Sequence, residues 1–98
     1  MHIISHRKLK EYFEKNPQSR VALQDWYKRA SRADWNNFAD VRRTINSVDA
    51  VGRSRFVFNI KGNHYRMVTI IFFRDNKVFI KWIGNHNEYS RIKDIRKI

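Results

Sequence analysis

The chain has 98 residues, of which 21 are Lys or Arg and 9 are Asp or Glu, so its formal net charge is +12. Solubility needs far less charge than this, and the excess repels itself in the folded state, so a polyanionic partner is expected. RNA is the best match, because nucleic acids are the usual partners of such basic domains. A hydrophobic content of 42% excludes a disordered tail. The length suits one domain over residues 1–98.

The sequence contains no cysteine, which excludes disulfides and thiolate metal sites and gives no reason to expect secretion. No apolar run is long enough to span a membrane, and MHIISHRKLK lacks the apolar core and the cleavage site of a signal peptide. His2 and His6 lie four residues apart without a third ligand, so no metal site is expected. We therefore expect a soluble cytoplasmic protein that uses no metal or other cofactor.

The first half of the chain has the periodicity of helices. Residues 1–5 alternate weakly and predict a short edge strand, and residues 7–15 predict a basic helix. The apolar stripe of this helix consists of Leu9, Tyr12 and Phe13. The helix ends near Asn16-Pro17, and this pair is also a start signal, because Asn16 can cap a second helix whose first position is taken by Pro17.

The second predicted helix runs to about Ser31. Its apolar residues are three and four positions apart, which places them on one face. They are Leu23, Trp26, Tyr27 and Ala30. A third, short helix is expected through Phe38, Val41 and Ile45, with either Asn36 or Asn37 as its N-cap.

After Gly52 the pattern changes to that of strands. Residues 55–60 (RFVFNI), 65–73 (YRMVTIIFF) and 78–83 (VFIKWI) are rich in β-forming residues, and turn-forming sequences connect them. Two consecutive tight turns predict an antiparallel meander. The tail, residues 88–98, is short and basic. The predicted fold class is α+β, with two or three N-terminal helices packed on an antiparallel sheet and a short C-terminal helix or tail.

The pairing of the last two strands decides which side chains share a face of the sheet. A two-residue turn would pair Arg74 with Lys77, so that Arg66 lies opposite Asn85. One face of the sheet then contains Arg66, Ile70, Phe72, Phe79, Lys81 and Ile83. The other face contains Met67, Thr69, Ile71, Phe73, Val78, Ile80 and Trp82. In this register Arg66 lies beside the GNHNEY segment at the end of the last strand.

This end of the sheet contains the residue types that cleave RNA without a metal. The reaction needs a group to accept the proton of the 2′-hydroxyl, a group to protonate the leaving 5′-oxygen, and a cation on the phosphate. Histidine suits the proton transfers, and arginine binds phosphate in a bidentate manner. The candidates are Arg66, His86 and Tyr89, with Asn59 and Lys61 nearby. Lys81 is a weaker candidate for the same centre, since it lies about 13 Å further along the strand.

Each candidate also has a purely structural interpretation. An arginine such as Arg66 is more often a solvated or phosphate-positioning charge, a histidine such as His86 a loop residue, and a tyrosine such as Tyr89 a core anchor with a satisfied hydroxyl group. Lys61-Gly62-Asn63 is most simply a turn. Residue types alone therefore leave both interpretations of the site open.

Four segments together resemble the HigB family of toxins from bacterial toxin–antitoxin pairs. They are DWYKRASRADWNNFADVRRTINSVDAVG, FNIKGNHYR, the hydrophobic strand ending in FF, and VFIKWIGNHNEY. The resemblance covers nearly the whole chain and implies the RelE-like fold. It implies a metal-independent endoribonuclease that cuts mRNA on the translating ribosome. It also implies a HigA-type helix-turn-helix antitoxin, through which operator DNA would be contacted only indirectly.

The resemblance also suggests residue roles. Arg66 matches the strand arginine of the family and would stabilise the phosphate in the transition state. His86 and Tyr89 match its C-terminal site, with His86 in acid–base catalysis and Tyr89 orienting or stacking the base or assisting proton transfer. The expected RNA contacts are Asn59, Lys61, Asn63, Lys81 and Arg91. The other cations would bind ribosomal RNA, which should weaken steeply with salt.

Two further hypotheses remain at this stage. A non-catalytic RNA- or ribosome-binding module has the same charge and predicts salt-sensitive binding without cleavage products. A DNA-binding regulator is disfavoured, because no helix-turn-helix pattern is present and the basic residues are spread along the chain.

Overall fold

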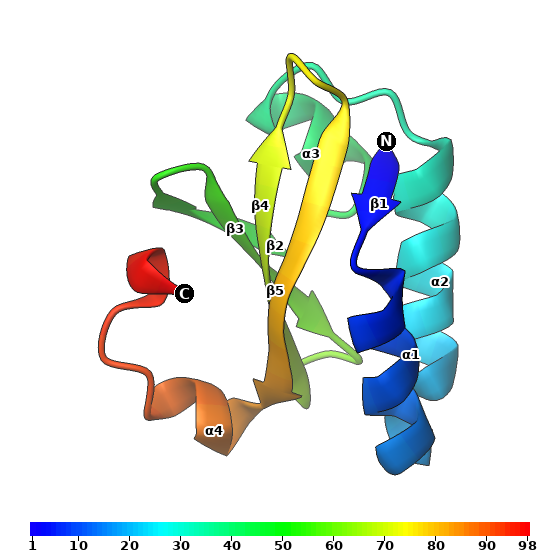
Figure 1. Ribbon diagram of the computed structural model, residues 1–98, viewed down its shortest axis with the longest axis vertical. Helices are drawn as coiled ribbons and strands as arrows, with labels where there is room; N and C mark the ends of the chain where they lie inside the picture. Colours follow the sequence, from blue (N-terminus) through cyan, green and yellow to red (C-terminus); the bar gives the residue numbers. More distant parts are fainter.

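A computed structural model describes all residues, 1–98, and shows helices packed on one five-stranded sheet (Figure 1). The strands are β1 (His2–Ile4), β2 (Val48–Gly52), β3 (Arg55–Ile60), β4 (Tyr65–Phe72) and β5 (Lys77–Asn85). The helices are α1 (His6–Lys15), α2 (Arg20–Arg32), α3 (Phe38–Thr44) and α4 (His86–Ser90). Two short 3₁₀ turns, η1 (Pro17–Ser19) and η2 (Ile95–Lys97), complete the chain. The α+β prediction is confirmed.

The sheet is mixed, whereas the sequence predicted an antiparallel one. The strand order is β1-β5-β4-β3-β2, and the four strands from β2 to β5 form the antiparallel part. The predicted edge strand at the N-terminus exists as β1, but it pairs with β5 in the parallel sense. The strand β2 was not predicted, because its five residues form only a short stretch with a bulge between Ala50 and Gly52.

The helices α1, α2 and α3 cover one face of the sheet, and the main core lies between them and the strands. The predicted helical stripes supply Leu9, Phe13, Leu23, Trp26 and Ala30, all of them buried. Tyr12 and Tyr27 are only partly buried. On the sheet side Phe58 is fully buried, and the rings of Trp26 and Trp35 lie 5.3 and 6.4 Å from it. We call this surface of the sheet the helix face.

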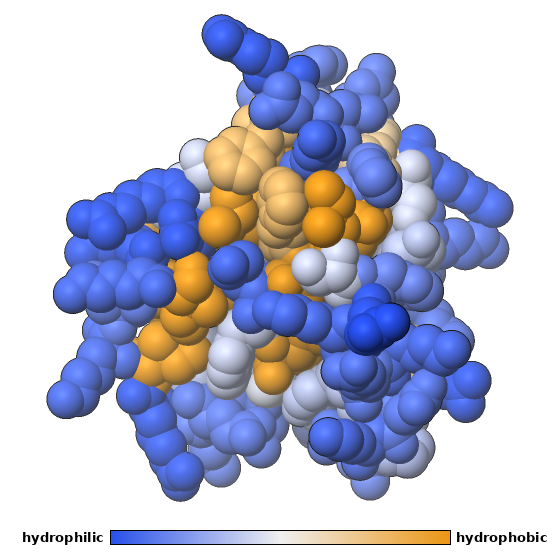
Figure 2. All heavy atoms as spheres, viewed as in Figure 1, coloured by the Kyte–Doolittle hydropathy of each residue, from blue (hydrophilic) through white to orange (hydrophobic).

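The opposite surface of the sheet, which we call the second face, is covered in part by the C-terminal segment. This segment turns back after α4 and reaches β2 and β3, where the Arg55 Nη2 donates to the Ile98 carbonyl at 2.8 Å (Figure 1). Val57 and Val68 are buried on this side. Toward the β4–β5 turn the second face is open, and apolar side chains gather on it (Figure 2). They include Ile70, Phe72 and Phe79.

The helix boundaries agree with the prediction except at Asn16. Its side-chain Nδ2 and its backbone N–H both donate to the Tyr12 carbonyl, at 3.0 and 2.9 Å, so Asn16 closes α1. It does not cap the following helix, because Pro17 starts a 3₁₀ turn that precedes α2. Of the two candidate caps for α3, Asn37 is the one used: its Oδ1 accepts a hydrogen bond from the Asp40 N–H at 3.0 Å.

The predicted register of β4 and β5 is wrong in two ways. Pairing begins at Phe72 and Lys77, because the turn has four residues and closes through a hydrogen bond from the Asn76 N–H to the Phe73 carbonyl. Asn76 adopts the left-handed conformation there, which asparagine tolerates. Lys81 then forms a β-bulge, since Thr69 pairs with Ile80 and Val68 with Trp82.

The bulge exchanges the faces of the residues that follow it. Trp82 pairs with Val68 and therefore lies on the second face, whereas Ile83 pairs with Met67 and joins the helix-face core. Both had been predicted on the opposite sides. Arg66 pairs with Gly84 instead of Asn85, so it still lies at the end of β5 and on the second face.

Candidate active site

Arg66 and Tyr89 form the centre of the candidate site, which lies on the second face of the sheet where β5 ends and α4 begins. The Arg66 guanidinium carbon lies 5.8 Å from the centroid of the Tyr89 ring. Its Nη1 also donates to the carbonyls of Asn63 and Tyr65, at 3.3 and 3.4 Å. These contacts hold the cation between the β3–β4 turn and α4. The remaining guanidinium N–H groups are free to bind a phosphate oxygen.

The short helix α4 is held in place by hydrogen bonds at its first turn. Asn85 and Glu88 form a capping box, in which each side chain accepts from the backbone N–H of the other at 2.8 Å. The His86 N–H donates to the His64 carbonyl at 3.1 Å and joins α4 to the β3–β4 turn. A helix of five residues is not stable by itself, so these bonds fix the position of Tyr89.

Trp82 and Gly84 shape the sheet surface beneath Tyr89. The Trp82 and Tyr89 ring centroids are 6.2 Å apart. The Trp82 ring also lies across Gly84, where an added Cβ would be 2.5 Å from the indole Cζ2. Gly84 is therefore required by the close approach of the indole, and its small size allows the aromatic pair to form.

The environment of Tyr89 favours its neutral phenol. Partial burial raises the Tyr89 pKa above its usual value, the Arg66 charge lowers it, and the Asp49 charge raises it again, with burial the largest effect. At neutral pH the Tyr89 hydroxyl group is therefore a hydrogen-bond donor. Asp49 belongs to this environment because it pairs with Val57 on the second face.

His86 lies at the first position of α4 and is exposed. It precedes Tyr89 by three residues, so the two side chains leave neighbouring turns of the same helix. His64 lies next to it across the hydrogen bond described above and is also exposed. Two exposed histidines therefore lie where the backbone of α4 is joined to the β3–β4 turn.

The other predicted RNA contacts divide into two groups. Asn59 pairs with Arg66 and lies on the second face, and Asn63 supports Arg66 through its carbonyl. Arg91 follows α4 directly and is exposed. Lys61 and Lys81 lie elsewhere.

The two lysines face the N-terminal helices. The Lys61 Nζ donates to the Gln18 carbonyl at 3.3 Å. The carbonyl of Lys81 accepts from the Lys8 Nζ at 3.5 Å, and Lys81 lines a shallow cavity of about 290 Å³ beside α1. The structure therefore does not place Lys61 or Lys81 with Arg66 and Tyr89.

Sequence reasoning missed three residues of the site: Asp49, His64 and Trp82. Asp49 had no signal, because β2 was not recognised. Trp82 was assigned to the opposite face, because a bulge cannot be seen in an alternating pattern. His64 follows the recognised turn, and its proximity to His86 depends on the pairing of β4 with β5.

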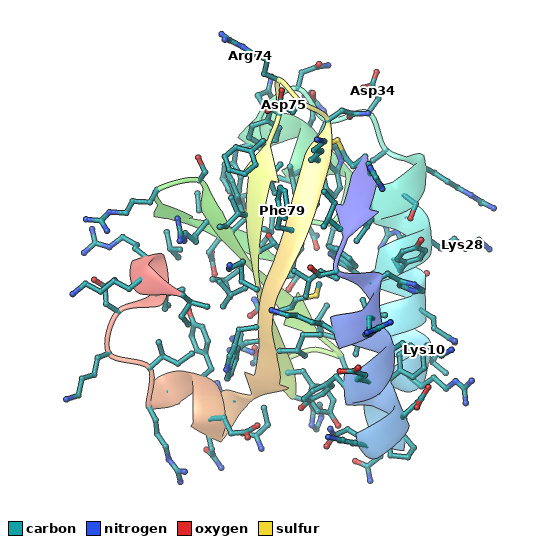
Figure 3. All side chains as sticks on the ribbon, viewed as in Figure 1. Lys10, Lys28, Asp34, Arg74, Asp75 and Phe79 are labelled. Atoms are coloured by element: carbon teal, nitrogen blue, oxygen red, sulfur yellow. The ribbon has the colours of Figure 1, made fainter.

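The candidate site lies far from the turn that carries Arg74 and Asp75, which is at the other end of the same hairpin (Figure 3). No group of three or more His, Cys, Asp or Glu side chains is arranged to hold a metal ion. The helices are all too short or too polar to cross a membrane.

A family model for the RelE-like toxic component of a toxin–antitoxin system, HigB_toxin, matches residues 19–92, and so includes the second-face site. The chain belongs to the HigB toxin family. Membership in this family confirms the resemblance seen in the sequence and the RelE-like α+β fold. It also means that this HigB-family toxin has an antitoxin as its partner.

Curated relatives of this HigB-family chain match over almost their whole length. The mRNA interferase HigB of Escherichia coli O6:H1 (strain CFT073) is 29% identical over 94 residues, which cover 94% of this chain and 91% of the relative. The mRNA interferase toxin HigB of Escherichia coli K12 is 29% identical over 92 residues, covering 92% and 88%. The mRNA interferase HigB of Shigella flexneri matches to the same extent, at 29% identity over 92 residues.

Replacement of Gly84 by alanine should disturb the site of this HigB-family toxin. The new Cβ would push the Trp82 indole away from Tyr89, and overpacking of this kind lowers the free energy of unfolding by about 1–3 kcal/mol. Urea denaturation measures the loss. In a Trp82→Ala background the obstacle is absent, so Gly84→Ala should then have little effect. An equal loss in both backgrounds would show that the indole is not the cause.

The stability of the protein should fall in alkaline solution because of Tyr12, a half-buried residue of α1. Burial, followed by the charges of Glu88 and Tyr65, raises the Tyr12 pKa from 10.0 to about 12. The folded state therefore keeps its proton in a range where the unfolded state has lost it. The contribution of the protonated Tyr12 hydroxyl group to the free energy of unfolding is complete below pH 10 and is lost as the pH rises toward 12.

Urea denaturation of the wild type and Tyr12→Phe across this range measures the effect. The wild type should lose stability relative to Tyr12→Phe only above pH 10. A difference between the two proteins that stays constant with pH would contradict the assignment.

Proposed function

We propose that this HigB-family toxin is an mRNA interferase, an endoribonuclease that requires no metal. The observation that carries the proposal is the Arg66 guanidinium held 5.8 Å from the ring of Tyr89, a residue of the short helix that begins at His86. A fixed cation beside an aromatic ring can bind the phosphate and the base of one nucleotide. The names of the relatives as mRNA interferases support the same activity.

The reaction that these residues suit is transfer of the phosphate to the adjacent 2′-oxygen. A bond forms between the 2′-oxygen and phosphorus, and the bond from phosphorus to the 5′-oxygen breaks. The products are a 2′,3′-cyclic phosphate and a free 5′-hydroxyl group. Arg66 stabilises the additional negative charge on the phosphate oxygens in the transition state.

The proton transfers are assigned to His86 and Tyr89. His86 accepts the proton of the 2′-hydroxyl group or donates one to the leaving 5′-oxygen. The neutral Tyr89 hydroxyl group is a hydrogen-bond donor, and its ring provides a surface on which a base can stack. Asn59, Asn63 and Arg91 line the approach to this centre and contact the RNA strand.

The ribosome is the proposed setting of the reaction. A single arginine and an exposed histidine make a weak general nuclease, and the ribosome would hold the mRNA in a reactive geometry that lowers the barrier. Many cations lie outside the site and would bind ribosomal RNA. They include Arg7, Lys8, Lys10, Lys28, Arg29, Lys93, Arg96 and Lys97.

The proposed biological unit is one toxin domain over residues 1–98 that acts in the cytoplasm. Its antitoxin partner is proposed to be a HigA-type protein with a helix-turn-helix domain. The toxin itself would then meet operator DNA only through that partner, in agreement with its lack of a helix-turn-helix pattern.

Replacement of Arg66 by alanine tests the proposal. Expression of the wild-type chain should arrest growth and generate new 5′ ends in mRNA, and Arg66→Ala should reduce cleavage about 100-fold or more. Arg74→Ala is the matched control, because Arg74 is an exposed arginine on the far turn of the same hairpin (Figure 3). Mapping of transcript 5′ ends after induction measures cleavage. Unchanged 5′ ends in Arg66→Ala would exclude this site, and their absence in the wild type would indicate an RNA-binding module.

The same mapping assigns the acid–base role. His86→Ala should reduce cleavage about 100-fold or more, because a positioned general acid or base contributes a factor of this size. His64→Ala serves as the control, since His64 is the neighbouring exposed histidine and is expected to have a smaller effect. If His64→Ala abolishes cleavage and His86→Ala does not, the proton transfers belong to His64.

A further inference from the structure

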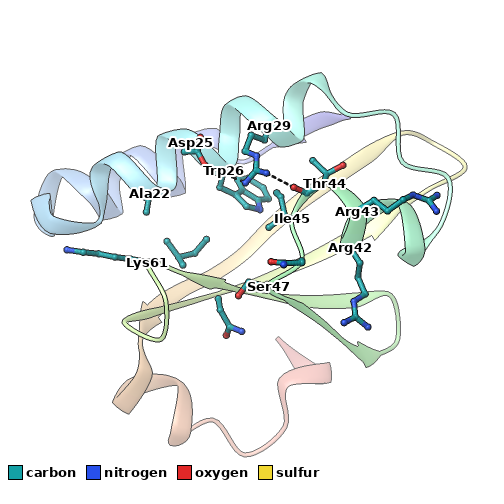
Figure 4. Close-up of a pocket in the computed structure, with 13 residues that line it drawn as sticks. Ala22, Asp25, Trp26, Arg29, Arg42, Arg43, Thr44, Ile45, Ser47 and Lys61 are labelled. Atoms are coloured by element: carbon teal, nitrogen blue, oxygen red, sulfur yellow. Dashed lines mark hydrogen bonds and ion pairs between the residues drawn. The ribbon is translucent and has the colours of Figure 1, made fainter.

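A basic cavity lies on the helix face, away from Arg66 and Tyr89. It has a volume of about 460 Å³ and lies between α2 and the β2–β3 part of the sheet (Figure 4). A volume of this size is typical of sites for small ligands or single nucleotides. Four cationic side chains from three segments of the chain line it. They are Arg29 of α2, Arg42 and Arg43 of α3, and Lys61 after β3.

Two of these cations are paired with carboxylates, Arg29 with Asp25 and Arg43 with Asp40, whereas Arg42 and Lys61 have no acidic partner. The Arg29 Nη2 donates to the Thr44 carbonyl at 2.6 Å (Figure 4), and Lys61 donates to the Gln18 carbonyl. The Arg42 guanidinium lies 5.7 Å from the Phe38 ring. Among the lining residues the only carboxylate is Asp25, at 3.8 Å from Arg29. The cavity therefore has an excess of positive charge and of hydrogen-bond donors.

A buried donor without a partner also lines this cavity. Trp26 is 2% exposed, and its Nε1 has no hydrogen-bond partner. Trp35 provides the contrast, because its Nε1 donates to the Thr44 Oγ1 at 3.0 Å. Buried polar groups without a partner are rare, and an indole N–H can only donate. The Trp26 N–H is covered in this structure, so it can donate to an acceptor in the cavity only after the atoms around it rearrange.

The β3–β4 turn connects this cavity with the cleavage site. Lys61 begins the turn and lines the cavity, whereas the carbonyl of Asn63, two residues later, holds Arg66. A strand of RNA that left the Arg66–Tyr89 centre across this turn would reach Lys61, whose positive charge can bind a phosphate.

We propose that this cavity binds a phosphate-bearing nucleotide of the RNA substrate, one that lies outside the cleaved step. The inference rests on the proposed function for the identity of the ligand, and it adds a second RNA subsite on the opposite side of the sheet. An acidic segment of a partner protein is the competing occupant, because carboxylates also accept from these donors. Continuity with the Arg66 site through the β3–β4 turn favours RNA.

The indole N–H resonance of Trp26 provides a direct readout. The experiment uses the full chain with Arg66→Ala, so that RNA stays intact, and a single-stranded oligoribonucleotide as the probe. Trp26→Phe in the same background assigns the resonance. On titration the Trp26 signal should shift and saturate, while the signal of Trp35, already bonded to Thr44, should stay in place.

Variants of the cavity test the contribution to affinity. Trp26→Phe keeps the ring and the net charge and removes one hydrogen bond, so it should weaken binding of the oligoribonucleotide about five-fold. Arg42→Gln with Lys61→Gln should weaken it further and reduce the slope of log affinity against log salt by about 2. Arg74→Gln with Lys77→Gln removes the same charge from two exposed residues at the β4–β5 turn, which line neither the cavity nor the Arg66 site (Figure 3). This control should leave the Trp26 shift unchanged.

Three outcomes would overturn the inference. The first is a Trp26 resonance that does not respond to the oligoribonucleotide. The second is a loss of affinity in the control pair equal to that in the cavity variants. The third is a Trp26 resonance that responds to a decameric poly-glutamate peptide and not to RNA. The proposed function fails separately. If the wild type cleaves mRNA through Arg66 while Trp26 is silent, only the subsite is wrong. If Trp26 responds but Arg66→Ala does not affect cleavage, only the cleavage site is wrong.

Discussion

The β-bulge at Lys81 is the constraint on which the site depends. Before the bulge, the side chains of β5 alternate so that Val78 and Ile80 enter the helix-face core. One additional residue then reverses the alternation, which turns Trp82 onto the second face and Ile83 into the core. Without it the indole would lie among the helices, and the second face would lack the aromatic surface beneath Tyr89. Bulges commonly re-aim side chains next to active sites in this way.

The same hairpin determines where α4 begins. Gly84 lies under the Trp82 ring, Asn85 caps α4, and His86 is bonded to the β3–β4 turn. These local contacts compensate for the low intrinsic stability of such a short helix. The positions of Arg66 and Tyr89 therefore follow from strand pairing and capping, and not from a large hydrophobic contact of α4 itself.

The strong positive charge has two separable roles in the proposed mechanism. Most of the cations lie on helices or in the tail, where they would supply affinity for RNA without sequence preference. The proposed cleavage reaction requires few of these cations. Arg66 is the one whose guanidinium is held against an aromatic ring of the second-face site. The cavity with Trp26 and Lys61 adds an intermediate class: cations that position one nucleotide without taking part in bond cleavage.

Sequence patterns were sufficient to predict the order and type of most elements. The apolar stripes of α1 and α2 and the β-rich segments of β3, β4 and β5 depend on local periodicity, which is visible in the chain. The same patterns placed Arg66 near the end of β5, because an error of one position in the register leaves that end of the hairpin unchanged. The resemblance to the HigB family depended on the order of such segments.

Several features depended on tertiary structure instead. The four-residue turn and the bulge at Lys81 decided the register, and neither alters the composition of the strands. β1 runs parallel to β5 because the helices carry the chain across the sheet, and β2 is a strand because β3 offers it an edge. The sequence by itself therefore determined the elements, the charge and the residue types available for catalysis. Only the tertiary structure decided which of those residues meet, because side-chain neighbours across a sheet are set by strand register and not by distance along the chain.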